Sequence, residues 1–263
     1  MQMRPSRVLK KLRAGHVASC VKLNFSDPRV AELAAMCGVD CIWLDREHTP
    51  CDLNEVENQI RAAKTHNVDT VVRVPRGSYS DLVHPLEMDA AGIMVPHLMS
   101  LEDARRVVWQ TRFHPIGRRP LDGGNADGSY CLVPTMDYMR QANRERFVIV
   151  QIEDPEAVPD LEQIAQLDGI DILFFGPADF SQGIGDPCNF DNPKIDETRR
   201  LIADTARRYG KFAGTVASCD TLAATVAMGY QFISAGADVL ACAQYFQRVG
   251  QAFAALETKS PHR

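Results

Sequence analysis

The sequence lacks the features that define several large classes of proteins. Its apolar runs stop well short of the roughly 20 residues that a membrane-spanning helix needs, so we expect no membrane partner. No run of Lys and Arg stands out and the formal net charge is −5, which disfavours a nucleic-acid partner. The basic stretch 1–14 has no apolar core of the kind that a secretory signal contains.

Zinc and disulfide spacings are also missing. The eight cysteines are scattered, with no CxxC pair and no Cys/His ligand pattern, so we expect free thiols and a reduced, cytoplasmic protein. No Gly-rich GxGxxG turn follows the first apolar run, which disfavours a dinucleotide-binding open sheet.

What the sequence does contain is a regular alternation of short apolar runs and amphipathic stretches. Nearly continuous apolar runs are typical of parallel strands that are buried on both faces. We predict eight strands, at residues 18–23, 41–44, 70–74, 92–96, 147–152, 171–175, 212–216 and 231–235.

Helix signals lie between these runs. Asp27 before Pro28, the pair Asp52 and Glu55, and Ser100 are predicted helix starts, and Asp154 before Pro155 is a fourth. Eight strands alternating with helices predict an α/β fold, a single (β/α)₈ TIM barrel that spans residues 1–263. A doubly wound open sheet is the second choice. The stretch 115–137 breaks the rhythm, and its position after the fourth helix would start it on the far side from the expected active-site face.

Ionisable and other polar residues gather where strands two to six end, and in a barrel these ends surround the active-site mouth. The residues are Asp45, Glu47, His48, Arg73, His97, Gln151, Glu153, Asp154 and Asp179. Strands seven and eight end instead in small residues. We therefore expect the chemistry on one side of the mouth.

Glu153 and Asp179 each follow an apolar strand and are candidate metal ligands. Two neighbouring carboxylates repel unless a cation lies between them, and hard oxygen ligands favour Mg²⁺ or Mn²⁺. The alternative is that these carboxylates cap helices, a role that suits Asp154 better than Glu153.

Arg73 and His48 are candidates for substrate binding and proton transfer. A guanidinium at a strand end can bind a carboxylate or 2-oxo oxygen through two N–H groups, although a salt bridge to Asp45 or Glu47 is an equal alternative. His48 is a candidate general base, and a structural role for it remains open. His97 is a weaker candidate.

Five segments together resemble the metal-dependent class II pyruvate aldolases of the HpcH/HpaI family. They are 43–50 (WLDREHTP), 72–75 (VRVP), 92–104 (GIMVPHLMSLEDA), 150–154 (VQIED) and 175–185 (FGPADFSQGIG). The resemblance implies a barrel of the phosphoenolpyruvate/pyruvate-binding type. It also implies a reaction in which pyruvate, as a metal-bound enolate, and an aldehyde are released from, or joined into, a 4-hydroxy-2-oxo acid.

The resemblance assigns roles to individual residues. Catalysis falls to His48, Arg73, Asp45 and Glu87, metal binding to Glu153 and Asp179, and substrate binding to Arg73, Gln151, Gly176, Pro177, Ala178 and Asp179. The cation would be Mg²⁺ or Mn²⁺, with Co²⁺ or Zn²⁺ as alternatives. Family members are usually hexamers, trimers of dimers that exchange their last helix, here about residues 239–256.

Three positions depart from the family pattern. Arg46 stands where glycine is common, Glu87 where the acidic partner of the histidine is usually Asp, and Asp89 where glycine is usual. These departures bear on proton transfer and on the choice of aldehyde, and hardly on pyruvate and metal binding. The sequence as a whole leaves the aldehyde, the stereochemistry and the preferred metal open. Alternatives to the aldolase are a macrophomate-synthase-like or oxaloacetate-decarboxylating enzyme, and a non-catalytic relative that binds a 2-oxo acid.

Overall fold

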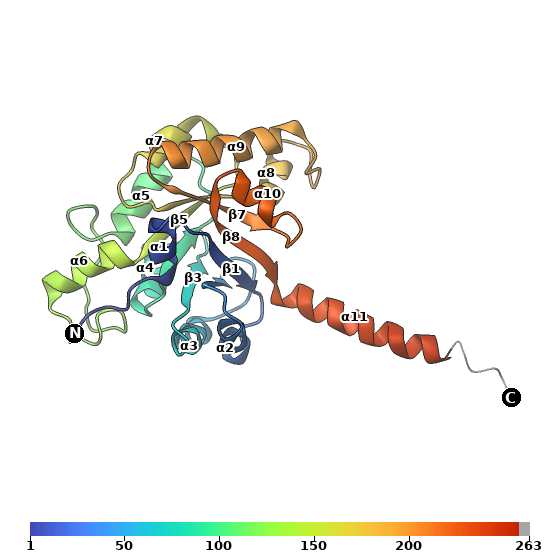
Figure 1. Ribbon diagram of the computed structural model, residues 1–263. Coiled ribbons are helices and arrows are strands. Elements are labelled where there is room, and N and C mark those ends of the chain that lie inside the picture. Colours follow the sequence, from blue (N-terminus) through green and yellow to red (C-terminus); the bar gives the residue numbers. More distant parts are fainter. Residues whose placement is uncertain (258–263) are drawn as a thin grey trace.

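Eight parallel strands close into a barrel in sequence order, and β1 completes the ring by pairing with β8 (Figure 1). The computed structural model describes residues 1–257, and the predicted fold class is confirmed. The strands are β1 (Ala18–Leu23), β2 (Cys41–Asp45), β3 (Asp69–Arg73), β4 (Gly92–Val95), β5 (Phe147–Ile152), β6 (Ile172–Phe175), β7 (Phe212–Ala217) and β8 (Tyr230–Ala237). The predicted boundaries match β1 and β5 and differ from those of the other strands by one or two residues.

Helices surround the barrel and follow its strands. They are α1 (Arg7–Arg13), α2 (Pro28–Met36), α3 (Leu53–Lys64), α4 (Tyr79–Glu87), α5 (Leu101–Thr111), α6 (Thr135–Glu145), α7 (Leu161–Ala165), α8 (Pro177–Gly183), α9 (Pro193–Arg208), α10 (Leu222–Ala227) and α11 (Asp238–Glu257). A 3-10 helix, η1 (Pro155–Asp160), precedes α7. None of the helices within residues 1–257 combines the length and apolar composition that a membrane span requires.

The predicted helix starts are confirmed at three sites. The side chains of Asp27 and Ser100 accept hydrogen bonds from the first turns of α2 and α5. Asp52 and Glu55 form the predicted capping box of α3. A helix also begins after Asp154 as predicted, the 3-10 helix η1, although the Asp154 side chain makes no capping hydrogen bond and contacts the ring of His97.

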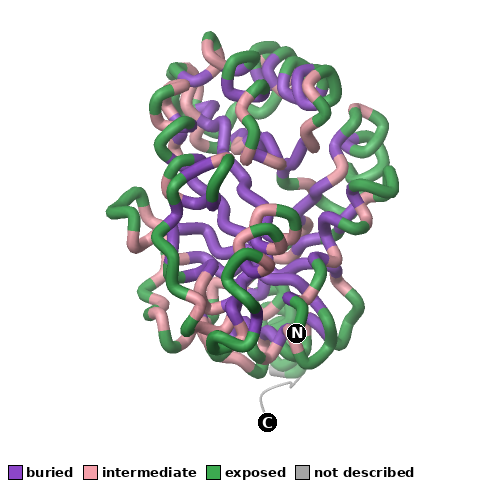
Figure 2. Tube along the Cα trace, turned by 90° about the vertical axis from the view of Figure 1, so that its left-hand side faces the viewer, coloured by how far each residue is buried: buried purple, intermediate pink, exposed green. Residues whose placement is uncertain are grey.

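The buried side chains of the strands form two layers, one inside the barrel and one between the barrel and its helices. Trp43, Val71, Met94 and Phe174 belong to the cluster that fills the barrel, whereas their neighbours pack in the layer under the helices. Figure 2 shows the strands as the buried centre of the molecule. Because side chains alternate along a strand, residues two positions beyond an inward-facing residue also face inward at the mouth.

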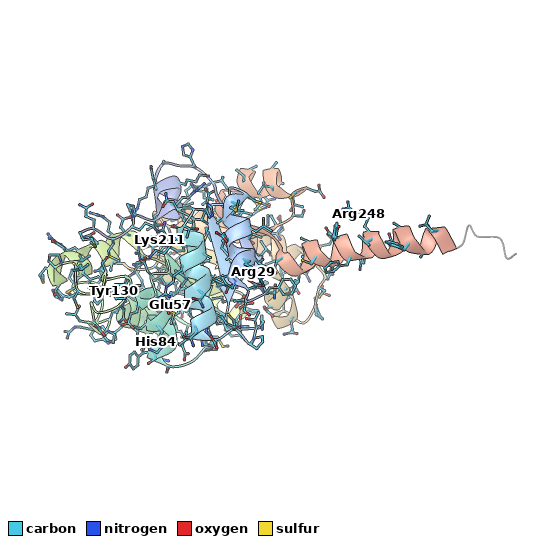
Figure 3. The ribbon with its side chains drawn as sticks, turned by 90° about the horizontal axis from the view of Figure 1, so that it is seen from below. Arg29, Glu57, His84, Tyr130, Lys211 and Arg248 are labelled. Atoms are coloured by element: carbon cyan, nitrogen blue, oxygen red, sulfur yellow. The ribbon has the colours of Figure 1, made fainter. Side chains whose placement is uncertain are left out.

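The last helix, α11, leaves the barrel and points away from it (Figure 1). Figure 3 shows Arg248 on this helix, well separated from the barrel. Its exposed apolar side chains are Leu240, Tyr245, Phe246, Val249, Phe253 and Leu256. The predicted C-terminal helix is present, and its exchange between subunits stays a prediction.

Candidate active site at the mouth of the barrel

Arg73 ends β3 and binds two carboxylates from the neighbouring strand. Its Nε and Nη2 donate to the two oxygens of Asp45 at 2.9 and 2.5 Å, and Nη1 lies 2.9 Å from Oε2 of Glu47. The register explains the contact, since Arg73 is the partner of Asp45 across β2 and β3. A guanidinium carries five N–H groups, so donors remain for a ligand at the mouth.

Asp45 is buried and shared between two cations. Nζ of Lys22, near the end of β1, lies 2.7 Å from its Oδ2. Burial alone would raise the pKa of Asp45, but hydrogen bonds and charge from Arg73 and Lys22 outweigh that effect and lower it to about 2. Asp45 thus fixes the position of Arg73. The same carboxylate also holds Nζ of Lys22.

Glu153 follows β5 and lies almost fully out of water, 2% exposed. Its Oε2 accepts from Nε2 of Gln151 at 2.7 Å, and its Oε1 accepts from the backbone N–H of His97 at 2.9 Å. A Cβ at residue 176 would lie 2.4 Å from Oε2 of Glu153, so only glycine fits there. The motif Gly176-Pro177 therefore leaves room for the carboxylate.

The surroundings of Glu153 disfavour the negative charge on its carboxylate. Burial raises the pKa of Glu153 from 4.5 to about 7, the backbone N–H and charge of His97 act against that rise, and Asp179 and Glu47 add to it. A carboxylate with such a pKa is one that a nearby cation would stabilise in its charged form.

His97, just after β4, has a left-handed backbone with φ of 51°. This conformation is uncommon for residues other than glycine and often marks functional sites. Its Nδ1 lies 3.1 Å from Oδ2 of Asp154 and 3.8 Å from Oε1 of Glu153, and its Nε2 lies 3.4 Å from Oε1 of Glu47. Burial would lower the pKa of His97, but the carboxylates of Glu153, Asp154 and Glu47 outweigh it and raise the pKa.

Glu153, Asp179 and His97 form a group that suits a divalent cation. Their nearest ligand atoms all lie within 4.8 Å of one another. Oε1 of the buried Gln151 has no hydrogen-bond partner among residues 1–257, so an acceptor for a further ligand is also present. The residues at this end of the barrel therefore fit the cation that the sequence predicted.

His48 lies at the edge of the site. Its side chain is 57% exposed and its Nε2 is 3.5 Å from Oε2 of Glu47. Arg46, between Asp45 and Glu47, points elsewhere, because its Nη1 lies 3.9 Å from Oδ1 of Asp81 at the start of α4. The bulky residue that replaces the family's glycine thus points toward the helix layer.

Glu87 is not brought to this site within one chain. It ends α4, which runs from the mouth back to the opposite end of the barrel, and its carbonyl accepts from the backbone N–H of Asp127. Burial raises the pKa of Glu87, and Asp127 adds to that rise against the charge of Arg119. The irregular stretch before α6 therefore packs at the far end, where the sequence placed its start.

The departure at Asp89 also has a structural explanation. Its φ is 72°, the left-handed region in which glycine is favoured. Its carboxylate contacts the side chains of Lys64 and Arg146, which hold the residue in that conformation. Asp89 is part of a structural network and lies outside the mouth.

Two residues of this site, Glu47 and His97, received no role or only a minor one from the sequence alone. Glu47 contacts both Arg73 and His97, and His97 is a member of the candidate metal group. Their positions at strand ends were the only signal, since cross-strand contacts and a left-handed backbone leave no local pattern in the sequence.

A closed (β/α)₈ barrel with buried carboxylates and an arginine at the carboxyl ends of its strands defines a class of barrel enzymes. The sequence profile described as HpcH/HpaI aldolase/citrate lyase matches residues 20–244. The chain belongs to the HpcH/HpaI aldolase/citrate lyase family.

Named relatives agree with this assignment. The chain is 32% identical over 235 residues to 2-keto-3-deoxy-L-rhamnonate aldolase of Escherichia coli O17:K52:H18 strain UMN026, covering 88% of this chain and 86% of that one. The solved HpcH/HpaI aldolase of Desulfitobacterium hafniense DCB-2 superposes with a TM-score of 0.89 at 26% identity, covering 97% of each chain. Macrophomate synthase superposes with a TM-score of 0.85 at 27% identity, covering 99% of this chain and 94% of that one. The protein is therefore an aldolase, a carbon–carbon lyase that acts on small molecules.

Proposed function

We propose that this aldolase depends on a divalent cation and converts a 4-hydroxy-2-oxo acid to pyruvate and an aldehyde, or the reverse. The observation that carries the proposal is the buried Glu153, which lies with Asp179 and His97 at the mouth, where His97 also contacts Glu47 and Glu47 contacts Arg73. A relative named for 2-keto-3-deoxy-L-rhamnonate supports a sugar-acid substrate of this class.

Glu153 and Asp179 would hold the cation, Mg²⁺ or Mn²⁺ as carboxylate ligands favour, with Co²⁺ and Zn²⁺ as alternatives. When bound, the cation supplies a Lewis acid that polarises the 2-oxo group. Arg73 would bind the 2-oxo acid through the N–H groups that Asp45 and Glu47 leave free. The backbone N–H groups of Ala178 and Asp179, in the first turn of α8, are donors for the substrate carboxylate.

Cleavage requires a base for the hydroxyl proton of the substrate. We assign this role to His48, whose exposed ring can reach a ligand at the mouth and whose Nε2 faces Glu47. The C–C electron pair then moves into the pyruvate half, and Arg73 stabilises the negative charge that develops on its oxygen. Glu87 has no place in this scheme for a single chain.

A second candidate keeps the pyruvate-binding groups but changes the reaction. The likeness to macrophomate synthase favours loss of CO₂ from oxaloacetate, followed by addition to another molecule. Both candidates use the same cation and Arg73, so the first experiment tests what they share. The assembly of several copies through α11 is part of the proposal and rests on the exposed apolar side chains of that helix.

The test is oxaloacetate decarboxylation by metal-stripped protein with and without Mg²⁺ or Mn²⁺. We expect pyruvate release only with metal, and its loss in Asp179→Asn. The surface variant Asp191→Asn is the control, since this exposed residue lies outside the group that could hold a cation. Pyruvate release that is independent of metal, or unchanged in Asp179→Asn, would refute the proposed site. Screening 4-hydroxy-2-oxo acids then separates the aldolase from the decarboxylase.

A further inference from the structure

A second cation, Lys22, lies beside Arg73 at the mouth and has no role in the proposed reaction. It belongs to β1, two positions after the inward-facing Cys20, and its register partners are Trp43 on β2 and Ala237 on β8. The side chain of Lys22 is 22% exposed, whereas that of Arg73 is 6% exposed. Because side chains alternate along a strand, Lys22 extends into the mouth, where it is the more accessible of the two cations.

Lys22 and Arg73 share one carboxylate oxygen. Nζ of Lys22 lies 2.7 Å from Oδ2 of Asp45, and Nη2 of Arg73 lies 2.5 Å from the same atom. The two nitrogens are therefore no more than about 5 Å apart, close enough for their positive charges to repel. Both cations also lie over the ring of Trp43, with Nζ 5.5 Å and the guanidinium carbon 4.8 Å from its centroid. Asp45 and the indole thus hold two positive charges side by side.

The positive charge of Lys22 is only partly balanced. Asp45 is the only acidic side chain that pairs with Lys22 among residues 1–257, and it also pairs with Arg73. Asp238, which directly follows β8, is engaged elsewhere, because its two oxygens accept hydrogen bonds from the backbone N–H groups that follow β1. An ammonium group has three N–H donors, of which Asp45 accepts one. Lys22 therefore keeps donors and positive charge for a ligand at the mouth.

We propose that Lys22 determines substrate specificity by binding a carboxylate at the far end of the 4-hydroxy-2-oxo acid, in the half that leaves as the aldehyde. The inference rests on the proposed function, in which Arg73 binds the 2-oxo group. It adds a second charged contact and names the preferred substrate as a 2-oxo acid with two carboxylates.

The spacing of the two cations fits such a substrate. In a six-carbon 2-oxo acid, four C–C bonds of about 1.5 Å separate the 2-oxo carbon from the far carboxyl carbon and span about 5 Å when extended. This length is similar to the separation of the cationic nitrogens of Arg73 and Lys22. The strands β7 and β8 end in Ala217 and Ala237, so their last residues place no bulky side chain on this side of the mouth.

The ammonium group also disfavours a neutral substrate. A substrate tail that covers Nζ of Lys22 removes water from its remaining N–H groups, and an apolar end offers no acceptor in return. A carboxylate replaces that water with charge-assisted hydrogen bonds, which are about twice as strong as neutral ones. Lys22 therefore separates substrates both by attraction and by the cost of losing water.

The test measures the binding of two six-carbon 2-oxo acids that differ only at the far end. 2-Oxoadipate ends in a carboxylate and 2-oxohexanoate in a methyl group, and neither has the 4-hydroxyl group that aldol cleavage requires. Calorimetry with Mn²⁺ present gives their dissociation constants for the wild type, Lys22→Met and Lys22→Arg. Lys22→Gln, which keeps an N–H group for Asp45, is measured as a second neutral variant, so the result does not depend on the folding of Lys22→Met.

Lys11→Met is the matched control. Nζ of Lys11 also lies 2.7 Å from a buried carboxylate, that of Asp40, which directly precedes β2 at the opposite end of the barrel. This variant loses the same charge and the same kind of ion pair away from the mouth.

We expect the wild type to bind 2-oxoadipate at least about tenfold more tightly than 2-oxohexanoate. The preference should fall below about threefold in Lys22→Met and Lys22→Gln, persist in Lys22→Arg and stay unchanged in Lys11→Met. Equal weakening of both acids in Lys22→Met would overturn the inference, because Lys22 would then act only through Asp45 and Arg73. A preference that survives in Lys22→Met, or that the wild type lacks, would also overturn it.

Repeating the titrations without Mn²⁺ separates this inference from the proposed function. If the wild type binds both acids equally and only with Mn²⁺, the inference fails and the metal-dependent site stands. If it prefers 2-oxoadipate through Lys22 whether or not Mn²⁺ is present, the proposed metal dependence fails and the inference stands. A wild type that binds neither acid refutes both.

Discussion

Replacing Glu153 with glutamine should stabilise the metal-free protein above neutral pH. The carboxylate is buried, and its pKa is raised from 4.5 to about 7. Glutamine keeps the hydrogen bonds without the charge. Its oxygen can accept from the backbone N–H of His97, and its amide can donate to the unpartnered Oε1 of Gln151 once that side chain turns over.

The size and sign of this change in stability follow from the linkage between the protonation of Glu153 and folding. Between pH 4.5 and 7 the folded protein keeps a proton on Glu153 that the unfolded chain has released, so stability falls as pH rises through this window. A difference of about 2.5 pKa units corresponds to about 3 kcal/mol at pH 8. The loss shrinks to under about 1 kcal/mol near pH 5, because this pH lies only about half a unit above the pKa at which the unfolded chain releases the proton.

Urea denaturation in the presence of a chelator measures the difference in unfolding free energy between Glu153→Gln and the wild type. Glu153→Gln should exceed the wild type in unfolding free energy by about 3 kcal/mol near pH 8, and the gap should narrow toward pH 5. Added Mg²⁺ or Mn²⁺ should stabilise only the wild type, since binding to the folded state alone raises its stability. A glutamine variant that is less stable near pH 8, or a gap that does not change with pH, would refute the reasoning.

Three further predictions address the other side chains. Arg73→Lys should lower kcat/KM for oxaloacetate about 100-fold, since lysine cannot reproduce the fork that binds Asp45; steady-state rates near those of the wild type would contradict this. His48→Asn should lower aldol cleavage at least about tenfold more than decarboxylation, because only cleavage needs a base for the hydroxyl proton; equal losses in the two assays would exclude that role. Serines at Phe246 and Phe253 on α11, 66% and 67% exposed, should reduce the molar mass measured by light scattering, and an unchanged mass would place the interface elsewhere.

The fold could be predicted because its signals are local. Parallel strands buried on both faces give unbroken apolar runs, and capping residues such as Asp52 mark the helices between them. The boundaries were less certain, since β8 continues to Ala237 through small residues that carry no strand signal. A helix begins after Asp154 as Pro155 predicts, but the Asp154 side chain contacts His97, which follows the neighbouring strand β4, and does not cap that helix. A contact between strands overrides the local pattern there.

The site was predicted where a strand end alone determines it. Arg73, Glu153 and Asp179 each follow apolar runs, so the barrel brings them to one end. The sequence alone could not show whether Arg73 binds a substrate or pairs with its acidic neighbours, because both roles use the same guanidinium. In the structure it pairs with Asp45 and Glu47 and keeps donors free. The two alternatives are therefore compatible.

The alternation of side chains past the end of β2 explains how the chain departs from its family without losing the site. Asp45 and Glu47 both reach Arg73 across the mouth, so Arg46 between them must point to the helix layer, where it approaches Asp81. A large cation at that position is therefore directed at the first turn of α4, and Asp45 and Glu47 keep their contacts with Arg73. The ring of His48, by contrast, is exposed and lies beside Glu47.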